Sequence, residues 1–222
     1  MIACGALAKT YATERGEVEA VRGVDLQVPR GQFVAVVGRS GSGKSSLMAM
    51  IGGLSRPTRG TVHVEGTDIW ALSDDGLADF RNRRIGFVFQ FPSLLATLRI
   101  IDNVALPALL GRRTAAGAAY AAAAEWLARL GLGDYLDAYP PEISAGEQRR
   151  AVIARALINA PGLLLADEPT SDLDEQTEAE IMDHLRLLNR DRELTLIVVT
   201  HNLRLAEQAD RVLHIANGRL VS

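Results

Sequence analysis

Short apolar runs of strand length alternate with helical patterns along most of the chain. Gln32–Gly38 is predicted to form a buried strand, and a helix is predicted to follow over Gly43–Leu54. Three further runs have the same buried character: Ile85–Gln90, Leu163–Asp167 and Thr195–Thr200. Continuous apolar strands that alternate with helices are typical of a mainly parallel sheet covered on both faces. The pattern therefore predicts an α/β fold.

Three segments depart from this pattern. Thr61–Gly66 alternates in part, which predicts a strand in a smaller antiparallel sheet, and Arg211–Gly218 is predicted to be a last strand that ends in an Asn-Gly turn. From Phe91 to Ala160 prolines and glycines separate several helical patterns and no strand is evident. One of these helices, Ala115–Leu130, is Ala-rich and needs no chemical role.

A single domain of residues 1–222 accounts for these elements. We expect residues 1–90 and 161–222 to form the α/β core with its antiparallel part, and residues 91–160 to form a helical subdomain inserted into it. A chain of this length can bury one substantial core or a core with a small subdomain.

Composition adds limits to this picture. The net charge of −3 gives no reason to expect nucleic acid or anionic lipid as a partner. The single cysteine, Cys4, leaves no internal disulfide framework and fits a reducing compartment. No apolar run reaches the roughly 18–20 residues that span a bilayer, and no signal peptide is recognised. We therefore expect a soluble cytoplasmic protein that acts at a membrane only through a partner.

A phosphate-binding loop follows the first buried strand. Its sequence matches G-x-x-x-x-G-K-[ST] and stands between a strand and a helix, the context that the motif requires. The glycines let successive N–H groups point at phosphate oxygens, while Lys44 is expected to reach the β- and γ-phosphates and Ser45 to bind Mg²⁺. The predicted nucleotide-binding residues here are Gly38, Arg39, Ser40, Gly41, Ser42, Gly43, Lys44, Ser45 and Ser46.

An acidic pair ends the apolar run Leu163–Asp167. Asp167 is expected to lie beside the phosphate loop and to hold Mg²⁺, and Glu168 follows it as the candidate general base for an attacking water. The plain alternative for such a pair is a helix N-cap. The phosphate loop in the same chain favours the catalytic role.

Gln90 and His201 each end another predicted strand. The amide oxygen of Gln90 can contact Mg²⁺ or water, and His201 can contact the γ-phosphate. Taken alone, such a glutamine is more often a surface residue and a single histidine is more often structural. They become catalytic candidates only because they accompany the loop and the acidic pair.

Ser144-Ala-Gly-Glu147 opens a helix predicted over Glu147–Asn159. Ser144 is first of all an N-cap, and Glu147 three residues later completes a capping box. A helix start made of small residues also offers N–H groups and a hydroxyl to a phosphate. One ATP can hardly use two phosphate-facing surfaces of the same chain. We therefore expect two copies of the chain to sandwich two ATP molecules.

Together these motifs resemble the ATP-binding subunit of an ABC transporter, in the right order and over essentially the whole chain. The resemblance implies a P-loop NTPase (RecA-like) core, ATP and Mg²⁺ as ligands, and ATP hydrolysis coupled to transport. It also implies that Tyr11 stacks on adenine and that a signature segment closes over the ATP held by the other subunit. The signature would be Ser144, Ala145, Gly146 and Glu147, and the loop that crosses the dimer would be Ser171, Asp172, Leu173 and Asp174.

The signature departs from the family's usual Leu-Ser-Gly-Gly-Gln. Ile143 and Glu147 are mild changes, whereas Ala145 replaces the first glycine and disfavours a positive φ. Its methyl group would narrow the approach of the backbone to a γ-phosphate. We expect function to be tolerated, with lower turnover as the direction of any effect.

Two further stretches resemble the ATPases that serve macrolide exporters and lipoprotein-releasing complexes: Arg84–Gln90 and Asn103–Pro107. In that group the permease transmits motion instead of carrying substrate through a channel. The expected docking surface for the permease is residues 91–100, where apolar side chains replace the polar ones of an ordinary loop. These are Phe91, Pro92, Leu94, Leu95, Leu98 and Ile100. Packing between subdomains would explain them equally well.

The motifs favour one of three functions. We expect an ATPase on the cytoplasmic face of the membrane, paired with itself or with a paralogous cassette, that drives a permease of exporter or mechanotransmission type. A soluble ABC ATPase acting on nucleic acid or ribosomes is disfavoured because the chain has no long coiled coil, no second cassette and no basic patch. A catalytically silent cassette is disfavoured by Lys44, Asp167, Glu168 and His201. The transported substrate and its direction are not specified.

Overall fold

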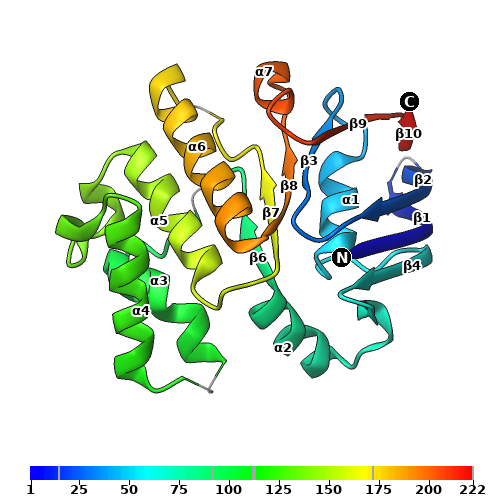
Figure 1. The fold of residues 1–222 in the computed structure, drawn as a ribbon. Helices are drawn as coiled ribbons and strands as arrows, with labels where there is room; N and C mark the ends of the chain where they lie inside the picture. Colours follow the sequence, from blue (N-terminus) through cyan, green and yellow to red (C-terminus); the bar gives the residue numbers. More distant parts are fainter. Residues whose placement is uncertain (15, 92, 112–113, 172, 222) are drawn as a thin grey trace.

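The computed structural model describes residues 1–14, 16–91, 93–111, 114–171 and 173–221. Within them, a six-stranded sheet has the order β10-β9-β3-β8-β7-β6 and a four-stranded sheet the order β2-β1-β4-β5. Figure 1 shows the larger sheet in the middle of the molecule, with helices α3, α4 and α5 gathered on one side and the smaller sheet on the other. No helix of these ranges is long and apolar enough to cross a bilayer.

The larger sheet is parallel except for its last strand. β3, β6, β7, β8 and β9 run parallel to their neighbours, and β10 pairs antiparallel with β9. The strands are β3 Phe33–Val37, β6 Ile85–Val88, β7 Leu163–Asp167, β8 Thr195–Val199, β9 Arg211–Ala216 and β10 Arg219–Val221. β3 and β8 are buried at every position, as strands covered on both faces should be. The predicted mainly parallel α/β core is confirmed.

The smaller sheet is antiparallel and contains the strand predicted over Thr61–Gly66, which runs two residues earlier, as β4 Arg59–Val64. Its other strands are β1 Ile2–Thr13, β2 Gly16–Val28 and β5 Thr67–Asp68. β1 and β2 were not predicted. Bulges interrupt the alternation of buried and exposed positions in β1. In β2 the positions from Val24 to Val28 do alternate, and this signal was overlooked.

The strand predicted over Arg211–Gly218 is β9 and ends at the Asn-Gly turn as expected, but it is not the last strand. Asn217 and Gly218 have φ of 50° and 76° and reverse the chain into β10. Two consecutive positive φ values are what a tight hairpin turn requires, and Asn-Gly supplies them at low cost.

Seven helices and three short 3-10 turns are present among the described residues. They are α1 Lys44–Ile51, α2 Asp74–Arg84, α3 Ile100–Leu110, α4 Ala116–Arg129, α5 Ala145–Leu157, α6 Glu175–Arg192 and α7 Leu203–Ala206, with single 3-10 turns at η1 Ile69–Ala71, η2 Gly133–Tyr135 and η3 Pro140–Glu142. The described residues between 91 and 160 contain helices and turns and no strand. The helix predicted over Glu147–Asn159 is α5, which begins and ends two residues earlier.

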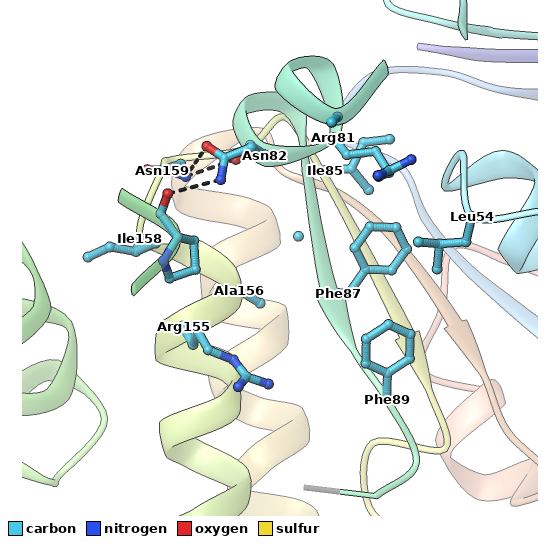
Figure 2. Close-up of a pocket in the computed structure, with 13 residues that line it drawn as sticks. Leu54, Arg81, Asn82, Ile85, Phe87, Phe89, Arg155, Ala156, Ile158 and Asn159 are labelled. Carbon is cyan, nitrogen blue, oxygen red and sulfur yellow. Dashed lines mark hydrogen bonds between the residues drawn. The ribbon is translucent and has the colours of Figure 1, made fainter. Parts of the chain in front are cut away.

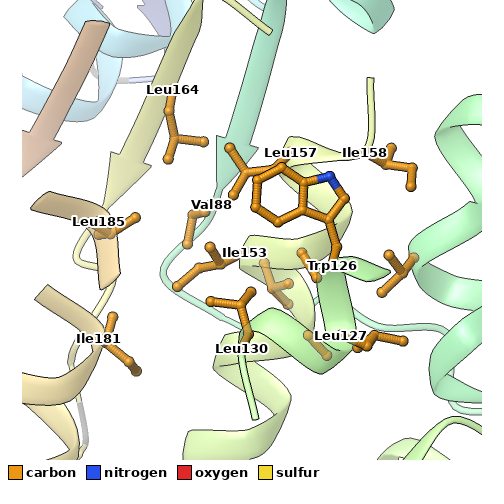
Figure 3. Close-up of a cluster of buried hydrophobic side chains, with 14 of the residues drawn as sticks. Val88, Trp126, Leu127, Leu130, Ile153, Leu157, Ile158, Leu164, Ile181 and Leu185 are labelled. Carbon is orange, nitrogen blue, oxygen red and sulfur yellow. The ribbon is translucent and has the colours of Figure 1, made fainter. Parts of the chain in front are cut away.

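Two apolar clusters cover the two faces of the sheet. Leu164 faces a cluster with α4, α5 and α6, whereas Leu163 and Leu165 face the opposite cluster with α1 and the antiparallel sheet. Figure 3 shows the first cluster, in which Trp126 from α4 lies against α5. Each fully buried leucine contributes roughly 1.5–3 kcal/mol. The sheet is therefore fixed from both sides, and its carboxyl edge is a rigid support for polar side chains.

Candidate functional site

The loop between β3 and α1 is shaped by two glycines with no room for a side chain. A Cβ at Gly38 would lie 2.3 Å from the Ile215 carbonyl oxygen, and one at Gly43 would lie 2.3 Å from the Ala20 carbonyl oxygen. Gly43 also has φ of 107°, which a residue with a Cβ rarely adopts. The loop can thus curl tightly and bring its N–H groups to the start of α1.

The donors of this loop are ready for an anion. The Lys44 ammonium donates to the carbonyl oxygens of Gly38 at 2.7 Å and Arg39 at 3.0 Å. The Ser42 hydroxyl is buried close to Gly38, 2.7 Å from where a Cβ of that glycine would lie, and has no hydrogen-bond partner among the described residues. The Lys44 ammonium and the N-terminus of α1 together form a site for phosphate.

A cavity of about 600 Å³ lies over this loop. It brings together most of the residues expected to bind and hydrolyse a nucleotide, and it adds Ala20, which the sequence did not suggest. Its lining is Tyr11, Ala20, Gly38, Arg39, Ser40, Gly41, Gly43, Lys44, Ser45, Ser46, Gln90, Asp167, Glu168 and His201. Tyr11 stands at the edge, 38% exposed, with its hydroxyl 3.4 Å from Ser46 Oγ. Ser42, the remaining predicted residue of the loop, does not line this cavity.

Asp167 and Glu168 stand at the end of β7, but their surroundings differ. Burial raises the pKa of the Asp167 carboxyl, partly offset by the hydroxyl of Ser45, which donates to it. Glu168 holds φ of 48°, an uncommon conformation for this residue, and its N–H donates to the Val199 carbonyl of β8 at 2.9 Å. Strained conformations of this kind concentrate at functional sites.

His201 is next to Glu168 because β7 and β8 are parallel neighbours. Its Nδ1 lies 3.0 Å from Glu168 Oε2, and its N–H donates to the same oxygen at 3.4 Å. The Glu168 side chain is only 14% exposed, whereas that of His201 is 74% exposed. The histidine therefore fixes one carboxylate oxygen and leaves its own ring open to the cavity.

Gln90 is held by a residue that the sequence analysis missed. The buried Arg149 guanidinium donates to the carbonyl oxygens of Phe89 at 2.6 Å and Gln90 at 2.7 Å. Arg149 lies on α5, five residues after the signature serine. A signal was present, since a charged residue on the inward face of a helix usually has a specific partner. The link connects the signature helix to the backbone of the glutamine.

The signature segment forms the predicted capping box. Ser144 donates from its N–H to Glu147 Oε2 at 2.7 Å and from its hydroxyl at 2.8 Å, and it accepts from the Glu147 N–H at 3.3 Å. These donors lower the pKa of Glu147. Ala145 is exposed as the first residue of α5 and is not among the described residues with positive φ. The backbone at Ala145 therefore does not require a positive φ, and alanine fits this position without backbone strain.

The structure keeps the signature away from the cavity of its own chain. No described residue among 144–147 lines that cavity. Gly146 instead faces α6, where a Cβ would lie 2.7 Å from Thr177 Cγ2. The signature helix start is thus in contact with α6 and not with the phosphate loop.

The loop before α6 is tied at both ends. The Ser171 hydroxyl donates to the Glu168 carbonyl oxygen at 3.1 Å, and Leu173 N–H donates to the Thr170 carbonyl at 3.3 Å. Asp174 caps α6 by accepting from the Thr177 N–H at 3.0 Å and hydroxyl at 2.7 Å, which lowers the pKa of Asp174. The fourth predicted loop residue, Asp172, lies outside the described residues.

In the apolar segment after Gln90, some side chains pack inside the protein and others remain exposed, so internal packing and a docking surface each explain part of it. Leu94 and Ile100 pack on the helical core cluster, whereas Phe91 is 71% and Leu95 is 48% exposed. Leu98 is half-buried, and Pro92 lies outside the described residues. The buried Asn103 amide donates to the carbonyls of Leu95, Leu98 and Arg99. The segment is thus a fixed loop that presents part of its apolar surface.

Comparison with known proteins agrees with this arrangement. The family model described as "ABC transporter" matches residues 21–171. The lipoprotein-releasing system ATP-binding protein LolD of Syntrophotalea carbinolica is 47% identical, covering 99% of this chain and 96% of that protein. LolD of Pseudomonas fluorescens is 42% identical, covering 100% and 97%.

Solved structures of similar fold include dimers. The dimeric ATP-binding cassette MJ0796, a bacterial ABC transporter cassette, superposes with a TM-score of 0.94 at 36% identity, covering 100% of this chain and 97% of that one. Its post-hydrolysis dimer bound to ADP and Pi superposes with a TM-score of 0.93 over the same shares. With the phosphate loop, the acidic strand end and the signature helix in one fold, this chain belongs to the ABC transporter family, as one of its ATP-binding proteins that hydrolyse ATP.

Proposed function

We propose that the protein works as a homodimer in which each ATP lies between the Lys44 loop of one subunit and the Ser144 signature of the other. Closure of this dimer around ATP drives a lipoprotein-releasing membrane permease. The observation that carries this proposal is the separation within one chain: the cavity holds the loop, Asp167, Glu168 and His201, and the signature stands outside it. A second copy supplies the missing surface. The dimeric relative MJ0796, which has the same fold, supports the pairing.

In this proposal the chain's own residues carry the hydrolysis step. The loop N–H groups and Lys44 bind the β- and γ-phosphates, and Tyr11 lies against the base. Glu168 accepts a proton from the water whose oxygen attacks the γ-phosphorus, and the bond to the ADP oxygen breaks. His201 holds one Glu168 oxygen at 3.0 Å, which orients the carboxylate and leaves its other oxygen to the water.

The same cavity fits Mg²⁺. Ser45, Asp167 and Gln90 would hold the ion, since hydroxyl, carboxylate and amide oxygens are the hard ligands that it prefers. The hydroxyl of Ser45 already donates to Asp167, so the two oxygens are together. When bound, Mg²⁺ supplies neutralisation of the phosphate charge. Few protein ligands suffice, because Mg²⁺ keeps waters and phosphate oxygens in its shell.

A cleft beside the fixed loop is the proposed docking site for the permease. Figure 2 shows this cleft, with a volume of about 380 Å³, between β6 on one side and α5 on the other. Phe87 and Phe89 stack along one wall with ring centroids 5.6 Å apart, and Leu54 stands beside them. The lining thus lies next to the predicted segment 91–100 rather than within it.

The charges of the cleft indicate what binds there. Among the described residues its lining includes two guanidinium groups, Arg81 and Arg155, and no carboxylate. Arg155 donates to the backbone carbonyl and hydroxyl of Ser93 at 2.7 and 2.6 Å, and burial lowers its pKa. A half-buried cation with no carboxylate among the described lining residues favours a partner that brings one. We therefore propose an amphipathic permease helix with an apolar face and an acidic residue.

The relatives support a proposal for the cargo and the location. The LolD proteins named above belong to lipoprotein-releasing systems, which supports lipoproteins as the cargo of this complex. Docking of a permease would hold the protein at the cytoplasmic face of the membrane as a peripheral subunit. The permease would transmit the closure as mechanical motion.

The test of the proposal is the variant Glu168→Gln. It removes the base and keeps the phosphate cradle, so ATP hydrolysis should be lost while ATP–Mg²⁺ should trap a dimer in size-exclusion chromatography. The matched control is Glu207→Gln, an exposed residue outside the cavity, which should hydrolyse ATP and show no trapped dimer. If Glu168→Gln elutes only as a monomer with ATP–Mg²⁺, the sandwich is wrong.

A further inference from the structure

A carboxylate on α6 holds the loop that carries His201. Asn202, the residue after His201, donates from Nδ2 to Glu178 Oε1 at 2.8 Å. Glu178 lies in the first turn of α6, and both side chains are half-buried. The bond joins the segments that follow β7 and β8, the two strands whose ends carry Glu168 and His201.

The Asn202 amide has only one way to face Glu178. Its Oδ1 already accepts from the Arg204 N–H at 3.0 Å and caps α7. The backbone N–H of Asn202 donates to the hydroxyl of Thr200 at 3.0 Å. Thr200 is buried, and its own backbone N–H donates to the Val36 carbonyl of β3. Because Oδ1 is used, Nδ2 must be the group that points at the carboxylate. The loop is thus anchored to the sheet below and to α6 at its side.

The same turn of α6 also contacts the signature helix. Thr177, beside Glu178, is the residue that Gly146 approaches so closely, and Asp174 caps the turn after the dimer loop. One helical turn therefore touches the signature through Thr177 and the His201 loop through Glu178.

We propose that Glu178 is a positioning residue, whose bond to Asn202 makes the His201 loop move together with the signature. When the signature of one subunit closes over the ATP held by its partner, the same movement places His201 of that subunit at its own ATP. The inference rests on the proposed roles of His201 and the signature. Glu178 itself lies outside the lining of the cavity and touches no reacting atom.

The bond has little to do for the stability of the fold. Asn202 remains a helix cap without it, and a half-exposed hydrogen bond at the surface contributes modestly. An effect on turnover without an equal effect on thermal stability would therefore mark positioning. A merely structural role would lower both.

The test exchanges the donor and acceptor. Glu178→Ala removes the acceptor, and Asn202→Asp keeps the α7 cap but sets two carboxylates against each other. In both variants kcat for ATP hydrolysis should fall roughly threefold to tenfold, because the loss of one hydrogen bond has an effect of about this size. KM for ATP should stay unchanged. Glu178→Gln keeps an acceptor oxygen and should retain the wild-type kcat. The double variant Asn202→Asp/Glu178→Gln restores a donor opposite an acceptor and should recover turnover.

Two controls separate this inference from the function on which it rests. Glu175→Ala removes an exposed acid from the same helical turn and should leave kcat and KM unchanged. His201→Ala should abolish most turnover; if it does not, the role of His201 and the positioning by Glu178 both fail. If His201→Ala is inactive while all Glu178 and Asn202 variants turn over like the wild type, only the positioning is overturned. A parallel fall in kcat and melting temperature that the double variant does not reverse also overturns it.

Discussion

At the scale of single residues, the signature uses the same atoms for the helix cap and for the phosphate binding that we propose. The Ser144 hydroxyl donates to Glu147 Oε2 at 2.8 Å and accepts from the Glu147 N–H at 3.3 Å, so it completes the helix cap without any ligand. The phosphate that we propose for this position would take over the same donors. The sequence predicted this box correctly, because a cap depends on residues three positions apart and on nothing distant.

Ala145 is the residue whose effect on turnover the sequence left in doubt. It occupies the first helical position with an exposed methyl group, and glycine there would only loosen the turn. Ala145→Gly should leave kcat for ATP unchanged or raise it, measured by phosphate release under saturating ATP. A tenfold fall, with Ala116→Gly at the start of α4 unaffected, would show that the methyl group has a role of its own.

Glu147 gives the signature a dependence on pH. The Ser144 donors lower the pKa of Glu147 in the folded protein, so its charge stabilises the fold above the ordinary glutamate value and is lost as the pH falls through the lowered one. Glu147→Gln should cost about 0.5 kcal/mol at pH 7, the usual contribution of an acid at a helix start. Urea unfolding should show this difference shrinking below about pH 4. A difference that is constant with pH would mean that charge is not the cause.

At the scale of elements, what was predictable depended on how local the signal is. β7 was predicted with its bounds because five consecutive apolar or terminal acidic positions define it, and Arg149 was missed because its partners lie about 60 positions earlier in the chain. β1 was missed because bulges disrupt its alternation, whereas the alternation of Val24–Val28 in β2 was overlooked. The cavity residues were found through motifs, whereas the bond between Asn202 and Glu178 has no motif and appears only when β7 and β8 are neighbours.

The contact between α5 and α6 makes a prediction at this scale. An alanine at Gly146 favours the helix, but its Cβ would lie 2.7 Å from Thr177 Cγ2, on a β-branched side chain with little freedom. Gly146→Ala should therefore destabilise the protein by about 1–2 kcal/mol in urea unfolding and slow ATP hydrolysis. Thr177→Ser removes the methyl and keeps the hydroxyl that donates to Asp174 at 2.7 Å, so it should restore both in the double variant. Without that rescue, the clash is not the cause.

At the scale of the whole molecule, the two functional surfaces are connected through the signature helix. α5 carries Ser144 at its start, Arg149 that holds the Gln90 backbone in its middle, and Arg155 in the proposed docking cleft near its end. A movement of this helix would displace all three together. The arrangement explains how an event at the ATP could reach a partner that never touches the nucleotide.

The permease cleft can be tested separately from the ATPase. Arg155→Glu reverses the charge that we expect to meet an acidic permease residue, and it lies outside the ATP cavity. ATP hydrolysis by the isolated protein should stay within about twofold of the wild type, since Arg155 does not line the ATP cavity and its hydrogen bonds are to Ser93. The membrane test uses tagged Glu168→Gln protein, pulled down from detergent-solubilised membranes in the presence of ATP. Adding Arg155→Glu to this protein should abolish copurification of the permease. Arg129→Glu on α4, away from the cleft, is the matched control and should keep it.

The protein that copurifies decides the wider proposal. A permease with about four spans of ~20 residues each and a large extracytoplasmic domain, lost in Arg155→Glu and kept in Arg129→Glu, would support mechanotransmission through the cleft. A permease with six or more such spans would assign the protein to a conventional importer or exporter and overturn the lipoprotein proposal. Retention of the permease by Arg155→Glu would place docking elsewhere. Recovery of soluble or ribosomal proteins alone would contradict the permease partner while leaving the chemistry at Glu168 intact.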